Sequence, residues 1–346
     1  MSSPLPSVWF VLLVFVLLAL LSWAGTRGYI ALARREGILD VPNERSSHSI
    51  PTPRGGGIVF VVLFLLFTAS CLVLFPGEAP LWRAILVGGS AVAFVGWMDD
   101  RKRGVPVRTR LAVHGAASVW VLAQLGGMPT IAVWDEVVYL GFFGHVLAFI
   151  GGMWVTNLYN FMDGIDGLAA GEAVCVAGTA SILIVRYGTP ASFALMALAA
   201  CVIGFLAWNL PRARVFMGDV GSYFLGFVFF AFALYTKNEK ILSLFLWASL
   251  LSVFVVDATF TLLARAIQGK PLTEGHREHI YQQAVLAGFS HGAVTSAALG
   301  VTLLACLAVY LDGVKIFRTF VLVYAVLICA WFAARYRLRG RPGAGR

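Results

Sequence analysis

The chain has 346 residues, of which 60% are hydrophobic and only 12% are charged. This composition excludes an ordinary soluble domain and indicates a protein embedded in a membrane. The formal net charge is +9, but the basic residues are spread over short loops, where they would meet anionic headgroups. The charge therefore does not indicate a nucleic-acid-binding protein.

Apolar runs long enough to cross about 30 Å of hydrocarbon as helices recur along the whole chain. They predict an all-α, polytopic membrane protein with ten to eleven transmembrane helices. We expect a single transmembrane domain over residues 1–335 and a basic tail without a fixed fold over 336–346. The expected spans are 8–26, 58–75, 83–98, 111–126, 142–157, 168–186, 191–208, 221–236, 241–264, 292–311 and 318–334.

The first apolar run follows MSSPLPS, which has neither a basic start nor a small-residue cleavage site, so we expect it to remain as a span. Lys and Arg then set the orientation, because they gather in alternate loops. By the positive-inside rule the N-terminus is outside and the C-terminus is cytoplasmic. The basic residues that fall on the outer side are Arg83, Arg186, Lys237, Lys240, Lys315 and Arg318.

Polar clusters interrupt the apolar pattern, and all of them fall on the expected cytoplasmic side. No loop there exceeds roughly thirty residues, which is too short for a separate domain of about 50 residues. The sequence also lacks the glycine-rich fingerprints of soluble nucleotide-binding folds. We therefore expect a functional site built from cytoplasmic loops and helix ends. The clusters are 48–57, 96–104, 157–168, 208–222 and 274–283.

The first acidic pair, Asp99 and Asp100, ends the third span. Acids at a helix C-terminus oppose the helix dipole, so charge is kept here at a cost. Neighbouring side chains on a helix diverge by about 100°, which favours two separate roles over one shared ion. A solvated helix end is the plain alternative.

The stretch NLYNFMDGIDGL carries Asn157, Asn160 and Asp163 at spacings of three, which aligns them along one side of a helix end. Asp166 follows in a glycine-flanked loop that opens the next helix. Capping that helix would explain Asp166 alone. It would not explain four polar side chains at a membrane face.

In VFMGDVGS, Asp219 lies between two glycines just before a span. It could cap that helix or bind a divalent cation, since Mg²⁺ is usually held by one or two carboxylates together with substrate phosphates. Phe216 offers a stacking surface for a flat base, although a lone aromatic is more often packing. Asn209 adds an amide near the same helix end.

The segment HREHIYQ places His276 and His279 three residues apart. Zinc is one interpretation, but no matching Cys or further His follows at ligand spacing. With Arg277 between them, an anion clamp for a diphosphate is the more natural interpretation. The five cysteines lie singly in apolar runs and indicate neither disulfides nor a metal site.

One acid, Asp257, lies deep in an apolar run, where a functional role and a structural partner are equally good interpretations. His114 and His291 lie near the cytoplasmic ends of two spans and carry no motif.

Five motifs occur in a fixed order: PTPRGGG, GWMDD, NxxNFMDGIDGLA, FMGDVGSxxLG and HxxHxYQ. Together, over about residues 40–285, they resemble the polyprenyl-phosphate N-acetylhexosamine-1-phosphate transferases of glycosyltransferase family 4. The resemblance implies a bacterial inner-membrane enzyme. Its reaction would join undecaprenyl phosphate to the sugar phosphate of a UDP-N-acetylhexosamine, giving a lipid diphosphate sugar and UMP.

The resemblance also implies roles for individual residues. Asp219 matches a magnesium ligand, with Mn²⁺ as a substitute, and Asp99 matches a residue that deprotonates the lipid phosphate. Asp100 matches its essential neighbour, and a one-step and a two-step mechanism both stay open. The residues expected to bind substrate are Arg54, Asn160, Asp163, Asp166, Asn209, Phe216, His276, Arg277 and His279.

One departure from the family bears on the donor. The peptidoglycan enzyme carries three consecutive histidines where this chain has HREHIYQQ. That favours the branch that starts O-antigen or other surface polysaccharides, with UDP-GlcNAc, UDP-FucNAc or UDP-QuiNAc as donor. The alternatives left open are a phospho-MurNAc-pentapeptide transferase and, in another class, a membrane transporter. A homodimer is also open.

Overall fold

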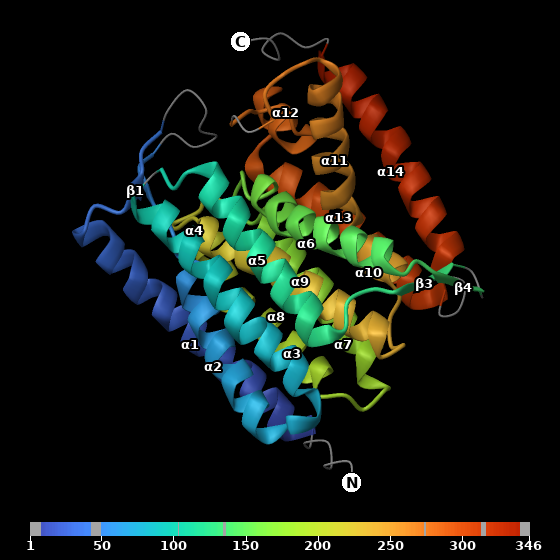
Figure 1. Cartoon of the computed structure of the whole chain (residues 1–346). Coiled ribbons are helices and arrows are strands. Elements are labelled where there is room, and N and C mark those ends of the chain that lie inside the picture. The colour runs from blue at the N-terminus through green and yellow to red at the C-terminus, as the bar shows by residue number, and fades with distance from the viewer. Residues whose placement is uncertain are drawn as a thin grey trace.

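The structure is a computed structural model that describes residues 8–42, 50–102, 104–133, 136–272, 275–312 and 316–339. It is a bundle of helices with two small hairpins (Figure 1). The α-helices are α1 (Val8–Arg35), α2 (Ile58–Leu74), α3 (Ala79–Arg83), α4 (Ser90–Lys102), α5 (Val107–Leu125), α6 (Phe142–Phe161), α7 (Leu168–Val185), α8 (Ala191–Asn209), α9 (Asp219–Asn238), α10 (Leu244–Leu250), α11 (Ser252–Ile267), α12 (Ile280–Leu286), α13 (His291–Asp312) and α14 (Ile316–Arg339).

The two hairpins lie at opposite ends of the bundle (Figure 1). In one, β1 (Leu39–Asp40) pairs antiparallel with β2 (Thr52–Pro53). In the other, β3 (Thr130–Val133) pairs antiparallel with β4 (Glu136–Tyr139). The first hairpin lies beside the ends of α1 and α4.

Each expected span falls on a helix, which confirms the all-α membrane fold. Among the described residues, eight helices are long and apolar enough to cross a membrane, or nine if α10 and α11 count as one. Helix α2 is apolar but shorter, and α5 does not reach the same level of hydropathy. The count of eleven spans therefore stays a prediction.

Three boundaries differ from those expected. The expected span 241–264 is broken into α10 and α11, which meet at an angle of 84°. The expected span 83–98 is part of a longer helical run, Pro76–Arg101, which includes a π-helical segment at Ala84–Gly89. Helix α14 continues to Arg339, four residues into the expected tail, and residues 340–346 lie outside the described residues.

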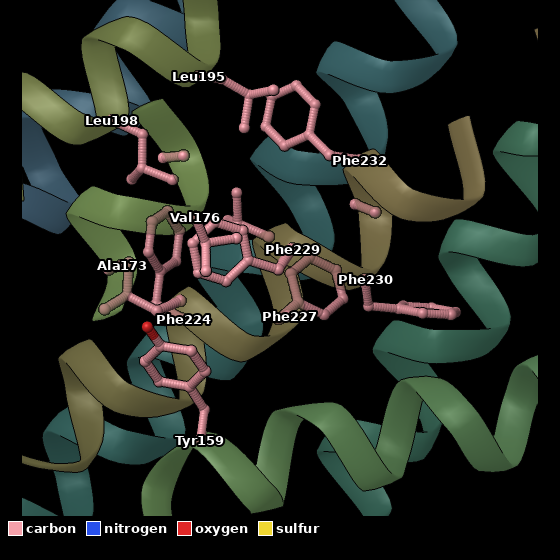
Figure 2. Close-up of a cluster of buried hydrophobic side chains, with 14 of the residues drawn as sticks. Tyr159, Ala173, Val176, Leu195, Leu198, Phe224, Phe227, Phe229, Phe230 and Phe232 are labelled. Carbon is pink, nitrogen blue, oxygen red and sulfur yellow. The ribbon is translucent and has the colours of Figure 1, made fainter. Parts of the chain in front are cut away.

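Helix α9 is the centre of the bundle, and all its residues from Asp219 to Thr236 are buried. Its aromatic side chains pack against α6, α7 and α8, as Figure 2 shows. Small residues let neighbouring backbones approach: a Cβ at Gly226 would lie 2.5 Å from the carbonyl oxygen of Val155. The labelled members of this cluster are Tyr159, Ala173, Val176, Leu195, Leu198, Phe224, Phe227, Phe229, Phe230 and Phe232.

Candidate active site

The described parts of the polar clusters come together around the N-terminus of α9. Arg54 pairs with Asp100 and Asp219, and Asn160 also binds Asp219. The loop before α9 is fastened to the β2 region, because the N–H of Phe216 donates to the carbonyl oxygen of Pro53 at 2.8 Å. Residues far apart in sequence therefore share one end of the bundle.

Asp100 holds the start of α9. Its Oδ1 accepts the backbone N–H of Asp219 at 2.9 Å and its Oδ2 accepts that of Val220 at 3.0 Å. The Nε of Arg54 donates to the same carboxylate at 2.8 Å. These N–H groups have no partner within the helix, so a carboxylate from another helix takes the place of a local cap.

Gly218 makes this contact possible. Its φ is +76°, which favours glycine. A Cβ there would lie 2.4 Å from Oδ2 of Asp100. The glycine before Asp219 thus allows the carboxylate of Asp100 to approach the backbone.

Asp219 is nearly buried and is surrounded by donors. Its Oδ1 accepts from Nη2 of Arg54 at 2.9 Å and from Nδ2 of Asn160 at 3.0 Å. Its Oδ2 lies 3.5 Å from Nη1 of Arg110. The carboxyl groups of Asp219 and Asp99 also lie within hydrogen-bonding reach of each other.

Asp99 has different partners from its neighbour Asp100. Its Oδ2 accepts from Nη1 of Arg110 at 3.1 Å, and its Oδ1 accepts the N–H of Val105 at 2.8 Å. Arg110 also donates to the hydroxyl of Tyr223 at 3.1 Å. The two adjacent carboxylates therefore face separate surroundings, one at the helix start and one at Arg110.

Carboxylates and arginines lie close together in this region, and they shift the pKa values of one another. Burial raises the pKa of Asp163 well above its usual range, and the nearby charge of Asp219 raises it further. Burial alone would lower the pKa of Arg54, but Asp219 and Asp100 raise it above its usual range. Arg54 is consequently a permanent cation among carboxylates, while Asp163 favours its neutral form.

A cavity of about 470 Å³, which we call the polar cavity, opens beside Asp219. Its lining combines charged and amide side chains with the apolar side chains of Phe216, Ile165, Val285 and Leu286. Such a mixed lining suits a ligand with an anionic part and a flat, less polar part. The remaining lining residues are Asp40, Arg54, Asn160, Asp163, Gly164, Asp166, Asn209, Gly218, Asp219, Arg277, Gln282 and His291.

Asp166 and Asn209 build the loop that closes this cavity. Asp166 accepts the N–H of Ala213 through Oδ2 at 3.0 Å, and its Oδ1 lies 3.1 Å from Nδ1 of His291. Asn209 accepts the N–H of Gly167 at 3.0 Å through its amide oxygen. Both side chains join the 163–167 loop to other segments, so both shape the cavity as well as line it.

A second hollow of about 610 Å³, which we call the apolar groove, lies on the other side of Asn160. Asn160, Gly164 and Gln282 line both hollows. The groove runs along α5, α6 and α11. Its other lining residues are Val107, Arg110, Leu111, Ile150, Met153, Trp154, Asn157, Phe161, Tyr223, Leu262, Leu272, Gly275, His276, His279 and Tyr281.

The structure divides the residues expected from sequence between these hollows. Most of them line the polar cavity, whereas Asp99 and Asp100 line neither hollow and instead contact Asp219. The three expected clamp residues are separated: Arg277 lines the polar cavity, but His276 and His279 line the groove. Burial, with the charges of His279 and Arg265, lowers the pKa of His276 to about 4, so His276 is neutral near pH 7.

Four further side chains at the site were not expected from the sequence: Arg110, Tyr223, Gln282 and His291. Arg110 counted only as a basic loop residue, and His291 lacked a motif. Each reaches the site through a tertiary contact, such as that of His291 with Asp166. Nothing in the local sequence marks Arg110, Tyr223 or His291, whereas Gln282 is part of the HxxHxYQ motif.

The donor set fits Mg²⁺. In the part of the chain that the structure describes, no group of three or more His, Cys, Asp or Glu side chains is arranged to hold a metal by itself. Mg²⁺ commonly uses one or two carboxylates and completes its shell with water and substrate phosphates. Asp219, in contact with Asp99 and facing the cavity, provides such a set of hard oxygen ligands.

Comparison with known proteins agrees with this geometry. The model of glycosyl transferase family 4 matches residues 82–237. A probable undecaprenyl-phosphate N-acetylglucosaminyl 1-phosphate transferase of Bacillus subtilis is 27% identical over 266 residues, 75% of this chain and 73% of that protein. A decaprenyl-phosphate N-acetylglucosaminephosphotransferase of Mycolicibacterium smegmatis is 29% identical over 321 residues, 81% of this chain and 76% of that protein.

A third relative extends the likeness further. The undecaprenyl-phosphate alpha-N-acetylglucosaminyl 1-phosphate transferase of Escherichia coli K12 is 27% identical over 333 residues, 88% of each chain. The matches thus cover the helices that carry Asp99, Asp100, Asn160 and Asp219. The chain is therefore similar to glycosyl transferase family 4 over residues 82–237, and to these three transferases over three quarters or more of its length.

Proposed function

We propose that this protein transfers N-acetylhexosamine 1-phosphate from a UDP-sugar to undecaprenyl phosphate and releases UMP. The observation that carries the proposal is the position of Asp219 and Asn160, where a polar cavity adjoins an apolar groove. The names of the relatives supply the two substrate classes, a polyprenyl phosphate and N-acetylglucosamine.

The polar cavity is suited to the donor. Arg54 and Arg277 offer fixed positive charge for a diphosphate. In the same cavity Phe216 offers a ring face, and Asn209 and Asp166 offer polar edges for a base. These two groups of side chains match the diphosphate and the base of a nucleotide sugar.

The apolar groove is suited to the acceptor. Leu111, Ile150 and Leu262 line it with hydrocarbon, and the described lining contains no acid. Arg110 lies at its inner end, beside Asp99 and near Asp219. A lipid phosphate that entered from the membrane would therefore meet one positive charge next to the carboxylates.

Phosphoryl transfer depends mainly on positioning and on neutralising charge. Bound Mg²⁺ would supply that neutralisation at the donor phosphates, with Asp219 as its protein ligand. Asn160 orients Asp219 through its 3.0 Å hydrogen bond, and Asp100 fixes the helix start that carries Asp219. Asp99 is also the carboxylate beside Arg110 and is placed to take the proton of the lipid phosphate.

For the donor we propose UDP-GlcNAc, because the relatives from three bacterial groups are named for N-acetylglucosamine. A role at the start of O-antigen or another surface polysaccharide rests on the HREHIYQQ segment. UDP-FucNAc, UDP-QuiNAc and UDP-MurNAc-pentapeptide are the alternative donors.

We also propose that the site faces the cytoplasm of a bacterial inner membrane. The basic residues Arg54, Arg101 and Arg110 lie at the site end, whereas Lys237 and Lys240 lie at the other end of α9. This asymmetry follows the positive-inside rule. A reporter fused after Arg346 should then be active only as a cytoplasmic type, and periplasmic alkaline phosphatase activity would overturn the orientation.

The reaction is tested with purified protein, undecaprenyl phosphate, Mg²⁺ and a panel of UDP-sugars, with UMP release measured for each donor. UMP release should require the lipid and the metal and should be fastest with UDP-GlcNAc. Failure of every donor in the panel would overturn the proposed reaction.

A further inference from the structure

Asp257, on α11, gathers hydrogen bonds from two other segments of the chain. Its Oδ1 accepts the N–H of Ile280 at 2.9 Å, the hydroxyl of Thr261 at 3.1 Å and Nε1–H of Trp331 at 3.2 Å. Its Oδ2 accepts the N–H of Tyr281 at 3.4 Å. Asp257 is 7% exposed, so these donors replace the water that a carboxylate would otherwise need.

Two of those donors are the first backbone N–H groups of α12. They have no acceptor within their own helix, and a carboxylate on α11 satisfies them. Nδ1 of His279, the residue before α12, lies 3.8 Å from the same carboxylate. The beginning of α12 is therefore fixed by a side chain from a different helix.

A second set of contacts holds the same segment at Glu278, two residues before Ile280. Glu278 pairs with Arg265 of α11 and with Lys270 at 3.1 Å. Arg335 of α14 lies 3.8 Å from the same carboxylate. Helices α11 and α14 thus both hold the segment at Glu278, as they do at Asp257 through Trp331.

A third tie joins the segment to the 160–164 region. The hydroxyl of Tyr281 donates to the carbonyl oxygen of Phe161 at 2.8 Å. A Cβ at Gly164 would lie 2.2 Å from this hydroxyl, so Tyr281 packs directly on the loop that carries Asp163. Any shift of α12 would move this loop as well.

The segment 275–286, held in this way, is the partition between the two hollows. Arg277, Val285 and Leu286 face the polar cavity, and His276 and His279 face the apolar groove. Gln282 lines both. The position of this segment therefore sets the shape of the cavity that we assign to the donor.

We propose that Asp257 is a positioning residue for donor binding: it holds segment 275–286 against the polar cavity, with Trp331 of α14 as its partner. The proposal rests on the proposed transferase function. Asp257 lines neither hollow, so it acts through the segment without touching a substrate.

The proposal makes the last helix part of the active-site assembly. Helix α14 lies far outside residues 82–237, which the family model matches. It forms one side of the bundle in Figure 1, next to α11 and α12. Trp331 of this helix nevertheless donates to Asp257, and Arg335 lies 3.8 Å from Glu278.

The test compares wild type, Asp257→Asn and Trp331→Phe for the KM of each substrate, kcat, and deuterium exchange of segment 275–286. The amide of Asp257→Asn keeps the size of the side chain but loses its charge, so the donor KM should rise roughly ten-fold. Trp331→Phe removes one N–H donor, and the donor KM should rise about three-fold. In both variants exchange should quicken in 275–286. The acceptor KM should rise by less than the donor KM, because Arg277, the arginine of the segment, lines the polar cavity, whereas the segment also lines the groove through His276 and His279.

Trp120→Phe is the matched control, because its indole N–H donates to the carbonyl oxygen of Arg83 at the other end of the bundle. It should change neither KM nor exchange in 275–286. If Asp257→Asn does not fold, Trp331→Phe and Thr261→Val carry the test.

A lowered melting temperature with an unchanged donor KM and unchanged exchange would overturn the positioning role and leave Asp257 a purely structural residue. If the wild type released UMP from no UDP-sugar, the proposed function would fail. The exchange comparison would still decide whether Asp257 holds the partition, because it needs no substrate.

Discussion

The polar cavity and the apolar groove adjoin at Asn160, yet they are lined by opposite chemistry. The cavity contains Asp163, Asp166 and Asp219 together with two arginines, whereas the described lining of the groove contains no acid. The cavity is also built from loops that side chains fasten to one another, while the groove runs along helix faces. A charged, water-soluble substrate and a lipid thus each have a matching surface.

This difference in lining indicates where the reaction takes place. The cavity holds most of the charged groups, whereas the described lining of the groove is mainly hydrocarbon with Arg110 as its arginine. Asp219 faces the cavity, and Arg110 of the groove lies 3.5 Å from it. The comparison predicts that variants in the cavity, in the groove and at their junction fall into three kinetic classes.

The largest effect is expected at the junction. Asp219→Asn removes the charge that would hold Mg²⁺, and kcat should fall about 100-fold or more, as for loss of one group that stabilises a transition state. UMP release is measured across a magnesium titration, with melting temperature as the check on folding. Glu36→Gln, which removes an exposed carboxylate paired with Arg101, is the control. Near-normal turnover of Asp219→Asn at limiting magnesium would contradict the assignment.

In the polar cavity, Arg277→Ala should raise the donor KM roughly ten-fold, since a hydrogen bond to a charged group contributes about 1.5 to 3 kcal/mol. The acceptor KM should stay the same. Arg101→Ala, which removes a half-exposed arginine outside both hollows, is the matched variant. A rise in the acceptor KM alone would show that Arg277 serves the lipid, and the division between the two hollows would then be wrong.

In the groove, Leu262→Trp narrows the hydrocarbon surface and should raise the KM for undecaprenyl phosphate about five-fold, because overpacking commonly costs 1 to 3 kcal/mol. A short-chain prenyl phosphate should be less affected. Leu263→Trp adds the same bulk to a neighbour that is 52% exposed and does not line the groove. Equal effects of both variants on both lipids would argue against the groove as the acceptor site.

The smallest effect concerns His276, whose pKa is lowered from 6.5 to about 4 by burial and by the charges of His279 and Arg265. The unfolded state therefore binds a proton more readily. The stability that His276 contributes is present above about pH 6.5 and is lost as the pH falls toward 4. His276→Gln should lose less thermal stability than wild type between pH 7 and pH 5. An identical pH dependence of the two melting temperatures would contradict this.

Several parts of the site could be predicted from the sequence because they have local signatures. The glycines around Asp219 and the polar periodicity of Asn160 and Asp163 are visible in a short window. Both patterns belong to helix ends, and the structure has helix ends there. The long apolar runs likewise predict helices, because backbone groups in hydrocarbon must be satisfied within the segment.

Other parts have no local signature. Asp100 caps a helix that begins 119 residues later, and His291 reaches Asp166 across 125 positions. The break between α10 and α11 occurs at Leu251, where the sequence has neither proline nor glycine. Such features depend on which helices pack together, and the sequence pattern of a single segment does not contain that information.

Because α9 is buried and α14 is exposed, the two helices should respond differently to the surrounding lipids. The apolar stretch of α9 is 94% buried, whereas that of α14 is 6% buried. Lipids therefore contact α14 directly, whereas other helices separate them from α9. Bilayer thickness should leave the rate constant of the chemical step, set by Asp219, nearly unchanged. Binding of the UDP-sugar that we propose as donor, which depends partly on Trp331 and Arg335, should instead vary with the lipids that surround the protein.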